Sequence, residues 1–356
     1  MQVADGSAAL IGMLTAVWER LLDRSPLGPD ENFFDLGGDS LLAMELVVRI
    51  KEASGCELPV ALIFEAPTIA SLAAAVRKQI ASPLSPVVSM KPGTDGLPLF
   101  LIPDISGAVM GYAALVRNIE VAFPIYAIRP KGAQGRDQPL MRVEDMADYN
   151  IEHIRTVRGG GPFRLAGYSF GGLVAFEMAR RLVAAGEDVE LLALIDSYPN
   201  ERLWPPRCRI DVMARQLIRR ITTMQNLTWR ELGPYVAERC RGLVDYLRRC
   251  IHDPHPGLAL DPASLQPSSR TVFAACWDAM AVYRPGYYDG RLAFLQPTQR
   301  DLTPHDPRKV WLKFARQVDV HVVPGSHSTM MSADVASVAG CLMACLEATD
   351  RSVECI

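Results

Sequence analysis

From residue 98 onward, short apolar runs alternate with longer stretches of helical periodicity. Apolar runs of this length, bounded by turn residues, are typical of buried strands, and strands that alternate with helices form a mainly parallel sheet. The pattern therefore predicts an α/β domain over about residues 98–350. The expected strands are Leu99–Ile102, Ile125–Ile128, Phe163–Ala166, Leu191–Ile195, Leu292–Leu295 and Val318–Val323.

One spacing in this series is much longer than the others. About a hundred residues lie between Ile195 and Leu292, although a crossover between parallel strands needs only about a dozen. The inserted segment has helical periodicity and many arginines. Long insertions in α/β folds often cover the active site, so we expect a helical lid at about 199–285.

The N-terminal part of the chain has a different character, because residues 5–81 carry only helical periodicity. Apolar residues recur at helical spacing from Leu10 to Leu21, a second helix is expected to start near Asp39, and Thr68 is expected to cap the last helix. These residues predict a small four-helix bundle. Residues 82–97 are rich in proline, glycine and serine and predict a linker, so the 356 residues divide into two domains.

Composition and charge argue against several classes of protein. The net charge of −3 gives no sign of a nucleic-acid partner, and no apolar run approaches the ~18–20 residues of a membrane span. The first residues lack the features of a secretory signal, so we expect a cytoplasmic protein. The eight cysteines show no zinc-ligand spacing, so we expect free thiols and no metal site. Cys341 and Cys345, four residues apart on an expected helix, are interpreted as core or surface residues.

Ser169 lies in the sequence Gly-Tyr-Ser-Phe-Gly, between the expected strand Phe163–Ala166 and a helix that begins at about Gly171. A serine in a tight turn between a strand and a helix is typical of the nucleophile elbow of α/β-hydrolases. The alternative is a serine that only caps an ordinary crossover helix. The flanking glycines favour the elbow, so we expect Ser169 to be a nucleophile.

A serine hydroxyl needs a base to act as a nucleophile at neutral pH. His327 follows the last expected strand on a Pro-Gly-Ser-His loop, which makes it the expected base. His321 lies inside that strand and is interpreted as structural, and His153 falls in a helix before the elbow. The remaining histidines are in irregular regions and are expected to be solvated: His252, His255 and His305.

Two carboxylates are candidates for the acid that orients the base. Asp196 directly follows the expected strand Leu191–Ile195, and Asp301 follows the next strand along the chain. Both can reach an imidazole from the carboxyl edge of the sheet. We favour Asp196, because a residue at a strand tip is better fixed in space, and Asp301 stays open as the alternative.

Acyl transfer also needs backbone N–H groups that stabilise the oxyanion. One is expected from Phe170, the residue after the nucleophile, and the other from the loop after the first strand of the domain. In that loop we favour the N–H of Ile105, with Ser106 as the near alternative.

Ser40 lies in the sequence Leu-Gly-Gly-Asp-Ser, at the start of an amphipathic helix. The N–H groups and dipole of a helix N-terminus favour a phosphate ester, and the two glycines leave the hydroxyl accessible to a modifying enzyme. The alternative is that Asp39 or Ser40 only caps the helix. A second apolar stripe of Leu41, Met44 and Val48 suggests a docking surface, or it completes the core.

These motifs together resemble a known pair of domains. Residues 5–81, with Leu-Gly-Gly-Asp-Ser-Leu at 36–41, resemble the peptidyl carrier (thiolation) domain of nonribosomal peptide synthetases. Residues 98–350 resemble the type I thioesterase domain of such synthetases, an α/β-hydrolase with a helical lid. The similarity rests on Gly-Tyr-Ser-Phe-Gly-Gly at 167–172, on Asp196 and on Gly-Ser-His at 325–327. Asp104 departs from the pattern, since the family more often has a small residue or a second proline there.

The resemblance implies that Ser40 carries 4′-phosphopantetheine, added by a phosphopantetheinyl transferase. A peptidyl or acyl thioester on that arm would be transferred to Ser169 and released by water or by an internal nucleophile, giving an acid or a ring. Upstream condensation and adenylation domains are the implied partners, with no nucleic acid and no membrane. Since the chain begins directly at the carrier, we expect it to be the end of a larger synthetase.

Two other hypotheses are possible for the function of a chain with these motifs. One is a stand-alone serine esterase or lipase with an N-terminal docking bundle. The other is a carrier scaffold whose hydrolase domain binds without turnover, and the presence of Ser169, Asp196 and His327 argues against it.

Overall fold

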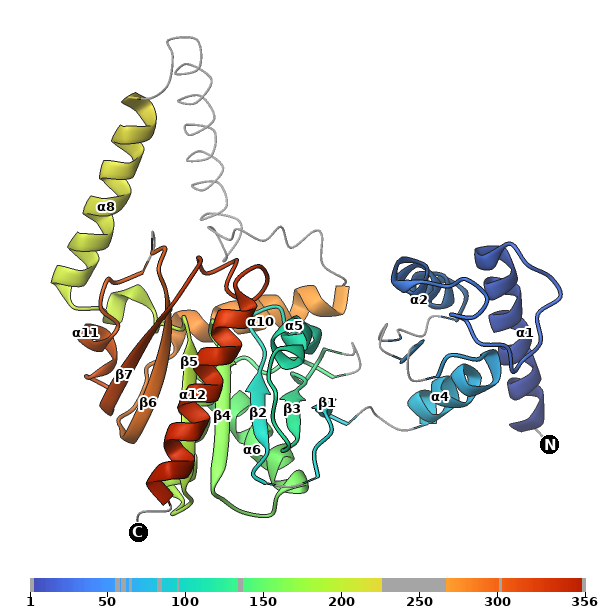
Figure 1. Ribbon diagram of the computed structural model, residues 1–356, viewed down its shortest axis with the longest axis horizontal. Coiled ribbons are helices and arrows are strands. Elements are labelled where there is room, and N and C mark those ends of the chain that lie inside the picture. The colour runs from blue at the N-terminus through green and yellow to red at the C-terminus, as the bar shows by residue number, and fades with distance from the viewer. Residues whose placement is uncertain are drawn as a thin grey trace. The chain divides into compact units, whose positions relative to one another are not determined.

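The structure is a computed structural model that describes residues 3–54, 58, 62–63, 66–81, 85–94, 96–133, 137–225, 267–300 and 303–353 (Figure 1). The chain divides into two compact units, Met1–Ser85 and Pro86–Ile356. Within the described part, none of the helices has the length and hydropathy of a membrane span.

The first unit contains the helices α1 (Val3–Leu22), α2 (Ser40–Ser54) and α4 (Ile69–Ala81). Leu14 and Trp18 of α1 are fully buried, and the Trp18 ring meets Phe33 edge-on with centroids 5.0 Å apart. The Thr68 hydroxyl accepts a hydrogen bond from the Ser71 N–H at 3.1 Å, so the expected cap of the last helix is confirmed. The segment between α2 and α4 is described only in part, and the expected fourth helix falls there.

The second unit is built on a seven-stranded sheet of order β1-β3-β2-β4-β5-β6-β7. All six expected strands are present and run parallel to one another, which confirms the predicted, mainly parallel sheet. The strands are β1 (Val87–Lys91), β2 (Leu99–Ile102), β3 (Ile125–Ile128), β4 (Phe163–Tyr168), β5 (Val189–Ile195), β6 (Tyr288–Pro297) and β7 (Ala315–Val323).

Strand β1 lies in the segment 82–97 that we expected to be a linker, so that expectation needs correction. Val87–Lys91 pairs antiparallel with β3 at the edge of the sheet. An edge strand of five residues, flanked by proline and glycine, has the composition of a linker and gains its strand character from its partner.

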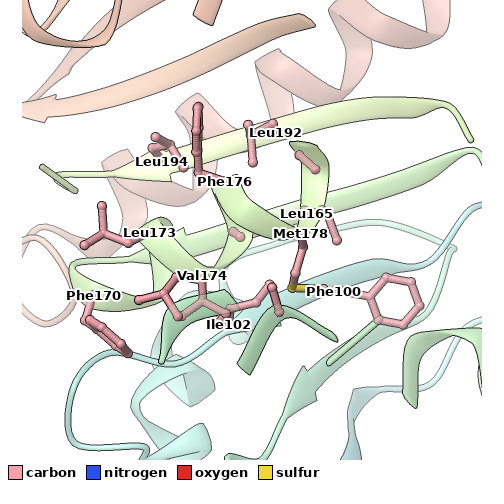
Figure 2. Packing of buried hydrophobic residues seen from close by; sticks show 14 of the residues in the cluster. Phe100, Ile102, Leu165, Phe170, Leu173, Val174, Phe176, Met178, Leu192 and Leu194 are labelled. Carbon is pink, nitrogen blue, oxygen red and sulfur yellow. The ribbon is translucent and has the colours of Figure 1, made fainter. Parts of the chain in front are cut away.

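Helices cover both faces of the sheet, because alternate strand residues point to opposite sides. On one face the helices α6 (Val143–Val157), α7 (Phe170–Ala184) and α10 (Pro267–Val282) bury one cluster, and Figure 2 shows apolar residues of α7 packed against β4 and β5. On the other face α5 (Ala113–Arg117) and α12 (Val335–Val353) bury a second cluster. The short helices are η1 (Val109–Tyr112), η2 (Glu201–Leu203) and α11 (Arg308–Trp311).

The expected lid at 199–285 is described only at its two ends. The helix α8 (Pro206–Gln225) opens it and α10 closes it, while residues 226–266 lie outside the described residues. On α10, Val272, Phe273 and Cys276 are buried in the core cluster on the α7 face. The C-terminal end of the insertion is therefore part of the domain core, since its apolar residues recur at helical spacing.

Candidate functional site

The carboxyl ends of three parallel strands hold the three residues expected to form a catalytic triad. Ser169 directly follows β4, Asp196 directly follows β5, and His327 lies on the loop after β7. The carboxyl ends of parallel strands meet at one edge of the sheet, where open α/β folds form their binding crevices.

The turn at Ser169 is strained and held by its neighbours. Ser169 has φ 54° and ψ −122°, in a region that non-glycine residues rarely adopt, and its N–H donates to the Ile195 carbonyl at 3.0 Å. A Cβ on Gly171 would lie 2.1 Å from the carbonyl oxygen of Ile102. The first turn of α7 therefore touches the end of β2, which explains the glycine two positions after the serine.

The base and the acid are in direct contact. His327 Nδ1 lies 2.7 Å from Asp196 Oδ2, and since a carboxylate only accepts, Nδ1–H is the donor. Asp196 is 4% exposed and its backbone is in the left-handed region at φ 43°. Its other oxygen has no hydrogen-bond partner among the described residues. The alternative acid Asp301 lies outside the described residues.

Tyr168 fixes the position of His327, and the sequence did not single it out. The two rings are stacked with centroids 4.9 Å apart, and the Tyr168 hydroxyl donates to the His327 carbonyl. Burial, together with the charges of Asp104 and Asp196, raises the pKa of Tyr168 far above its usual value, so the hydroxyl remains a donor. The sequence does offer one signal for Tyr168. It lies directly before Ser169 in the elbow motif, so its side chain must lie close to the nucleophile.

Two backbone N–H groups are available for an oxyanion. Among the described residues, neither Phe170 N–H nor Ile105 N–H has an intramolecular partner. The Ser106 N–H, the alternative oxyanion donor, already donates to Asp104 Oδ1 at 2.9 Å. The first turn of α7 and the 103–105 loop are in contact through Gly171, so the two free amides belong to adjacent backbone segments.

A small, mainly apolar cavity of about 30 Å³ is lined in part by Phe170 and by the end of β2. Burial and the charge of Asp104 raise the pKa of the Cys276 thiol in its wall to about 12, so that thiol stays protonated and unreactive. Residues of the cavity wall include Ile102, Pro103, Phe170, Val174, Val272 and Cys276.

The other histidines stay apart from this site where they are described. His153 Nδ1 lies 2.6 Å from the Tyr149 carbonyl within α6, and His305 is exposed. His321 lies inside β7 as expected. His252 and His255 lie outside the described residues.

In the first unit, Ser40 is the first residue of α2, and Asp39 is the capping residue. Asp39 Oδ1 accepts from the Leu42 N–H, and its carbonyl accepts from the Ala43 N–H, both at 2.8 Å. Ser40 is thus not needed as a cap, and the helix N-terminus at which it stands suits a phosphate ester. A Cβ on Gly38 would lie 2.4 Å from the Phe33 ring, so this loop packs closely onto the bundle.

The expected second stripe of α2 is exposed where it is described. Met44 is 50% exposed and Val48 is 51% exposed. These side chains are therefore not part of the core, which favours the interpretation of the stripe as a docking surface. The side chain of Leu41 lies outside the described residues.

Comparison with known families assigns both units. Residues 97–344 match the thioesterase domain family, and residues 14–76 match the phosphopantetheine attachment site family. Among curated relatives, a dimodular nonribosomal peptide synthase of Bacillus subtilis is 40% identical over 192 residues, 54% of this chain and 8% of that protein. Malpibaldin synthetase of Mortierella alpina is 28% identical over 333 residues, 92% of this chain and 6% of that protein. The chain therefore spans a small fraction of the relatives it matches.

Solved structures show the same fold. A four-domain nonribosomal peptide synthetase in its holo form, bound to AMP and glycine, aligns with a TM-score of 0.55 at 24% identity, over 94% of this chain and 26% of that one. The NocB thioesterase domain from the nocardicin cluster aligns with a TM-score of 0.50 at 23% identity, over 73% of this chain and 98% of that one.

Proposed function

This chain belongs to the thioesterase-domain family and carries a phosphopantetheine-attachment domain ahead of it, and on that premise we propose that it releases a finished peptidyl or acyl chain from its own carrier. The observation that carries the proposal is the His327–Asp196 pair at 2.7 Å, on the sheet edge where a strained serine follows β4. A serine, an imidazole and a buried carboxylate in this arrangement catalyse acyl transfer.

In the proposed mechanism, Ser169 Oγ attacks the thioester carbonyl and gives its proton to His327 Nε2. Asp196 holds the Nδ1–H, which keeps Nε2 free to accept that proton. The oxyanion binds the N–H groups of Phe170 and Ile105. The C–S bond then breaks, the thiol leaves with the proton from His327, and the acyl group remains as an ester on Ser169.

A second nucleophile completes the reaction. His327 deprotonates water, which gives a free acid, or an internal amine or hydroxyl of the acyl chain, which gives a ring. The C–O bond to Ser169 breaks and the serine regains its proton.

Ser40 is the proposed attachment point of the cofactor. When bound, 4′-phosphopantetheine supplies a flexible arm that ends in a thiol. The start of α2 offers N–H groups to its phosphate, and Asp39 relieves Ser40 of capping. A phosphopantetheinyl transferase would modify this serine, and upstream condensation and adenylation domains would supply the acyl chain.

The domain limits follow from this assignment. We place a four-helix carrier bundle at 5–81 and the α/β-hydrolase domain from Pro86 to about 350, with a lid at about 199–285. Joining the two domains raises the effective concentration of the substrate at the active site to the order of mM.

The test loads the chain with an acyl-phosphopantetheine from acyl-coenzyme A by means of a broad-specificity transferase. Intact mass should show one adduct, absent in Ser40→Ala. The acyl group should leave the wild-type chain and persist on Ser169→Ala. No adduct on the wild type would favour the stand-alone esterase, and discharge at the wild-type rate by Ser169→Ala would overturn the nucleophile.

A further inference from the structure

A cluster of metal-binding side chains lies between β7 and α12. His321 has the same parity along β7 as Val323, which is buried in the cluster under α12, so its side chain faces that helix. Cys341 and Cys345 are four residues apart on α12 and therefore project to the same side. No zinc-ligand spacing is visible in the sequence, because the third residue of the cluster comes from a different element.

The distances within the cluster suit a tetrahedral metal. One nitrogen of His321 and the two Sγ atoms all lie within 4.8 Å of one another. Cys345 Sγ is 3.6 Å from His321 Nε2. With Zn–S bonds of about 2.3 Å and Zn–N bonds of about 2.0 Å, a sulfur and a nitrogen ligand on tetrahedral zinc are about 3.5 Å apart. Cys345 Sγ and His321 Nε2 therefore already have the separation that two ligands of one tetrahedral zinc require.

Among the described residues, the donors that come together here are two sulfurs and one nitrogen. The nearby carboxylates are held by arginines, because Glu190 pairs with Arg164 at 2.7 Å and Asp319 pairs with Arg291. A cavity of about 70 Å³, lined in part by His321 and Cys345, leaves room for a water as the fourth ligand.

We propose that His321, Cys341 and Cys345 bind one Zn²⁺ ion, with water as the fourth ligand. Thiolate and imidazole donors favour zinc over Mg²⁺ or Ca²⁺. On binding, each thiol releases its proton to solvent, and the ion joins α12 to the strand whose loop carries His327. The site lies on the face of the sheet opposite α7, the helix that follows Ser169, so we assign the ion a role in holding α12 to β7 and no part in acyl transfer.

The full chain, purified under reducing conditions and stripped with a chelator, tests the site with Zn²⁺ alone. We expect one zinc ion per chain after dialysis and a rise in Tm on zinc binding. Replacement by Co²⁺ should give thiolate charge-transfer absorption together with the visible bands of tetrahedral cobalt.

The variants separate this site from other thiols. Cys345→Ser, Cys341→Ser and His321→Gln should each weaken zinc binding at least tenfold and remove the rise in Tm. Cys208→Ser is the matched control, a buried cysteine on α8 that should retain one zinc. If Cys345→Ser does not fold, Cys341→Ser still tests the site, because Cys341 is only half-buried. Less than about 0.1 zinc per wild-type chain, or unchanged cobalt spectra in the Cys341 and His321 variants, would overturn the proposal.

Discussion

The two serines that carry the proposed chemistry both stand at the start of a helix, yet the two helices begin differently. The start of α2 is capped by Asp39, with ordinary local hydrogen bonds. The start of α7 has no side-chain cap. Ser169 is held at positive φ, its N–H bonds to the end of β5, and Gly171 after it packs against the end of β2. A serine modified by another enzyme needs only an accessible helix end, whereas a nucleophile must be aimed by the surrounding fold.

The largest expected effect comes from Asp196→Asn, which should slow acyl release by about 10³- to 10⁴-fold, because an amide no longer enforces the working tautomer of His327. Loading of Ser40 should be unchanged, so the effect separates the two serines. Single-turnover release from the acylated chain is the measurement, and Asp301→Asn is the control. If Asp196→Asn releases the acyl group at a near-normal rate and Asp301→Asn is slow, the orienting acid is Asp301.

Gly171→Ala should lower the free energy of unfolding of the second unit by about 2–3 kcal/mol. The added Cβ would lie 2.1 Å from the backbone oxygen of Ile102 and 2.4 Å from that of Pro103, so the backbone itself would have to shift. Gly12→Ala in α1 is the control, since its Cβ meets nothing within 4 Å, and it should stabilise α1 by about 0.5–1 kcal/mol. Hydrogen exchange resolved by segment reports both changes. Equal effects would mean that the elbow is no more constrained than an exposed helix.

The elbow could be predicted from sequence because its signals are local. Features that depend on long-range contacts could not be predicted. The strand, turn and helix around Ser169 lie within a few residues of one another, and the sequence predicted all six parallel strands. Strand β1 was missed because its pairing with β3 depends on residues about forty positions away. The role of Tyr168 was missed because its partner, the His327 carbonyl, is 159 residues away along the chain.

Glu177 is a buried carboxylate on α7, and its replacement should have the next largest effect. It is 1% exposed and accepts hydrogen bonds from Arg180, Arg181 and Tyr283. Burial alone would raise the pKa of Glu177, but the two arginines outweigh it and hold the pKa below its usual range. The carboxylate therefore stabilises the fold at neutral pH, and this contribution is lost as the pH falls through the depressed pKa.

Glu177→Gln should lower the free energy of unfolding by about 2 kcal/mol at pH 7. The difference from the wild type should shrink below about pH 4, as the wild-type carboxylate becomes protonated. The matched control is Glu45→Gln on α2, whose exposed pair with Arg49 should contribute at most about 0.5 kcal/mol. Denaturant unfolding across pH is the measurement, and a constant difference down to pH 3 would contradict the assignment.

The cap of α2 is the corresponding local test in the carrier. Asp39→Ala should destabilise the first turn of α2 by about 1 kcal/mol, because the Leu42 N–H loses its acceptor. Asp39→Asn should have a smaller effect, since asparagine also caps. Amide exchange in α2, with α4 as the internal reference, measures the change. Unchanged exchange in Asp39→Ala would mean that α2 is held by packing, as α7 is.

Tyr168→Phe should have the smallest effect, about a three- to fivefold fall in the rate of acyl release, equivalent to under about 1 kcal/mol. The variant keeps the ring stacked on His327 but loses the hydrogen bond to the His327 carbonyl, so the imidazole is aimed less well. Since Tyr168 acts through His327, kcat should fall while KM is unchanged. Tyr168→Ala removes the stack as well and should be slower still. Because burial keeps the pKa of Tyr168 far above neutral, the pH profile of Tyr168→Phe should match the wild type, and a shifted profile would assign the hydroxyl a direct part in proton transfer.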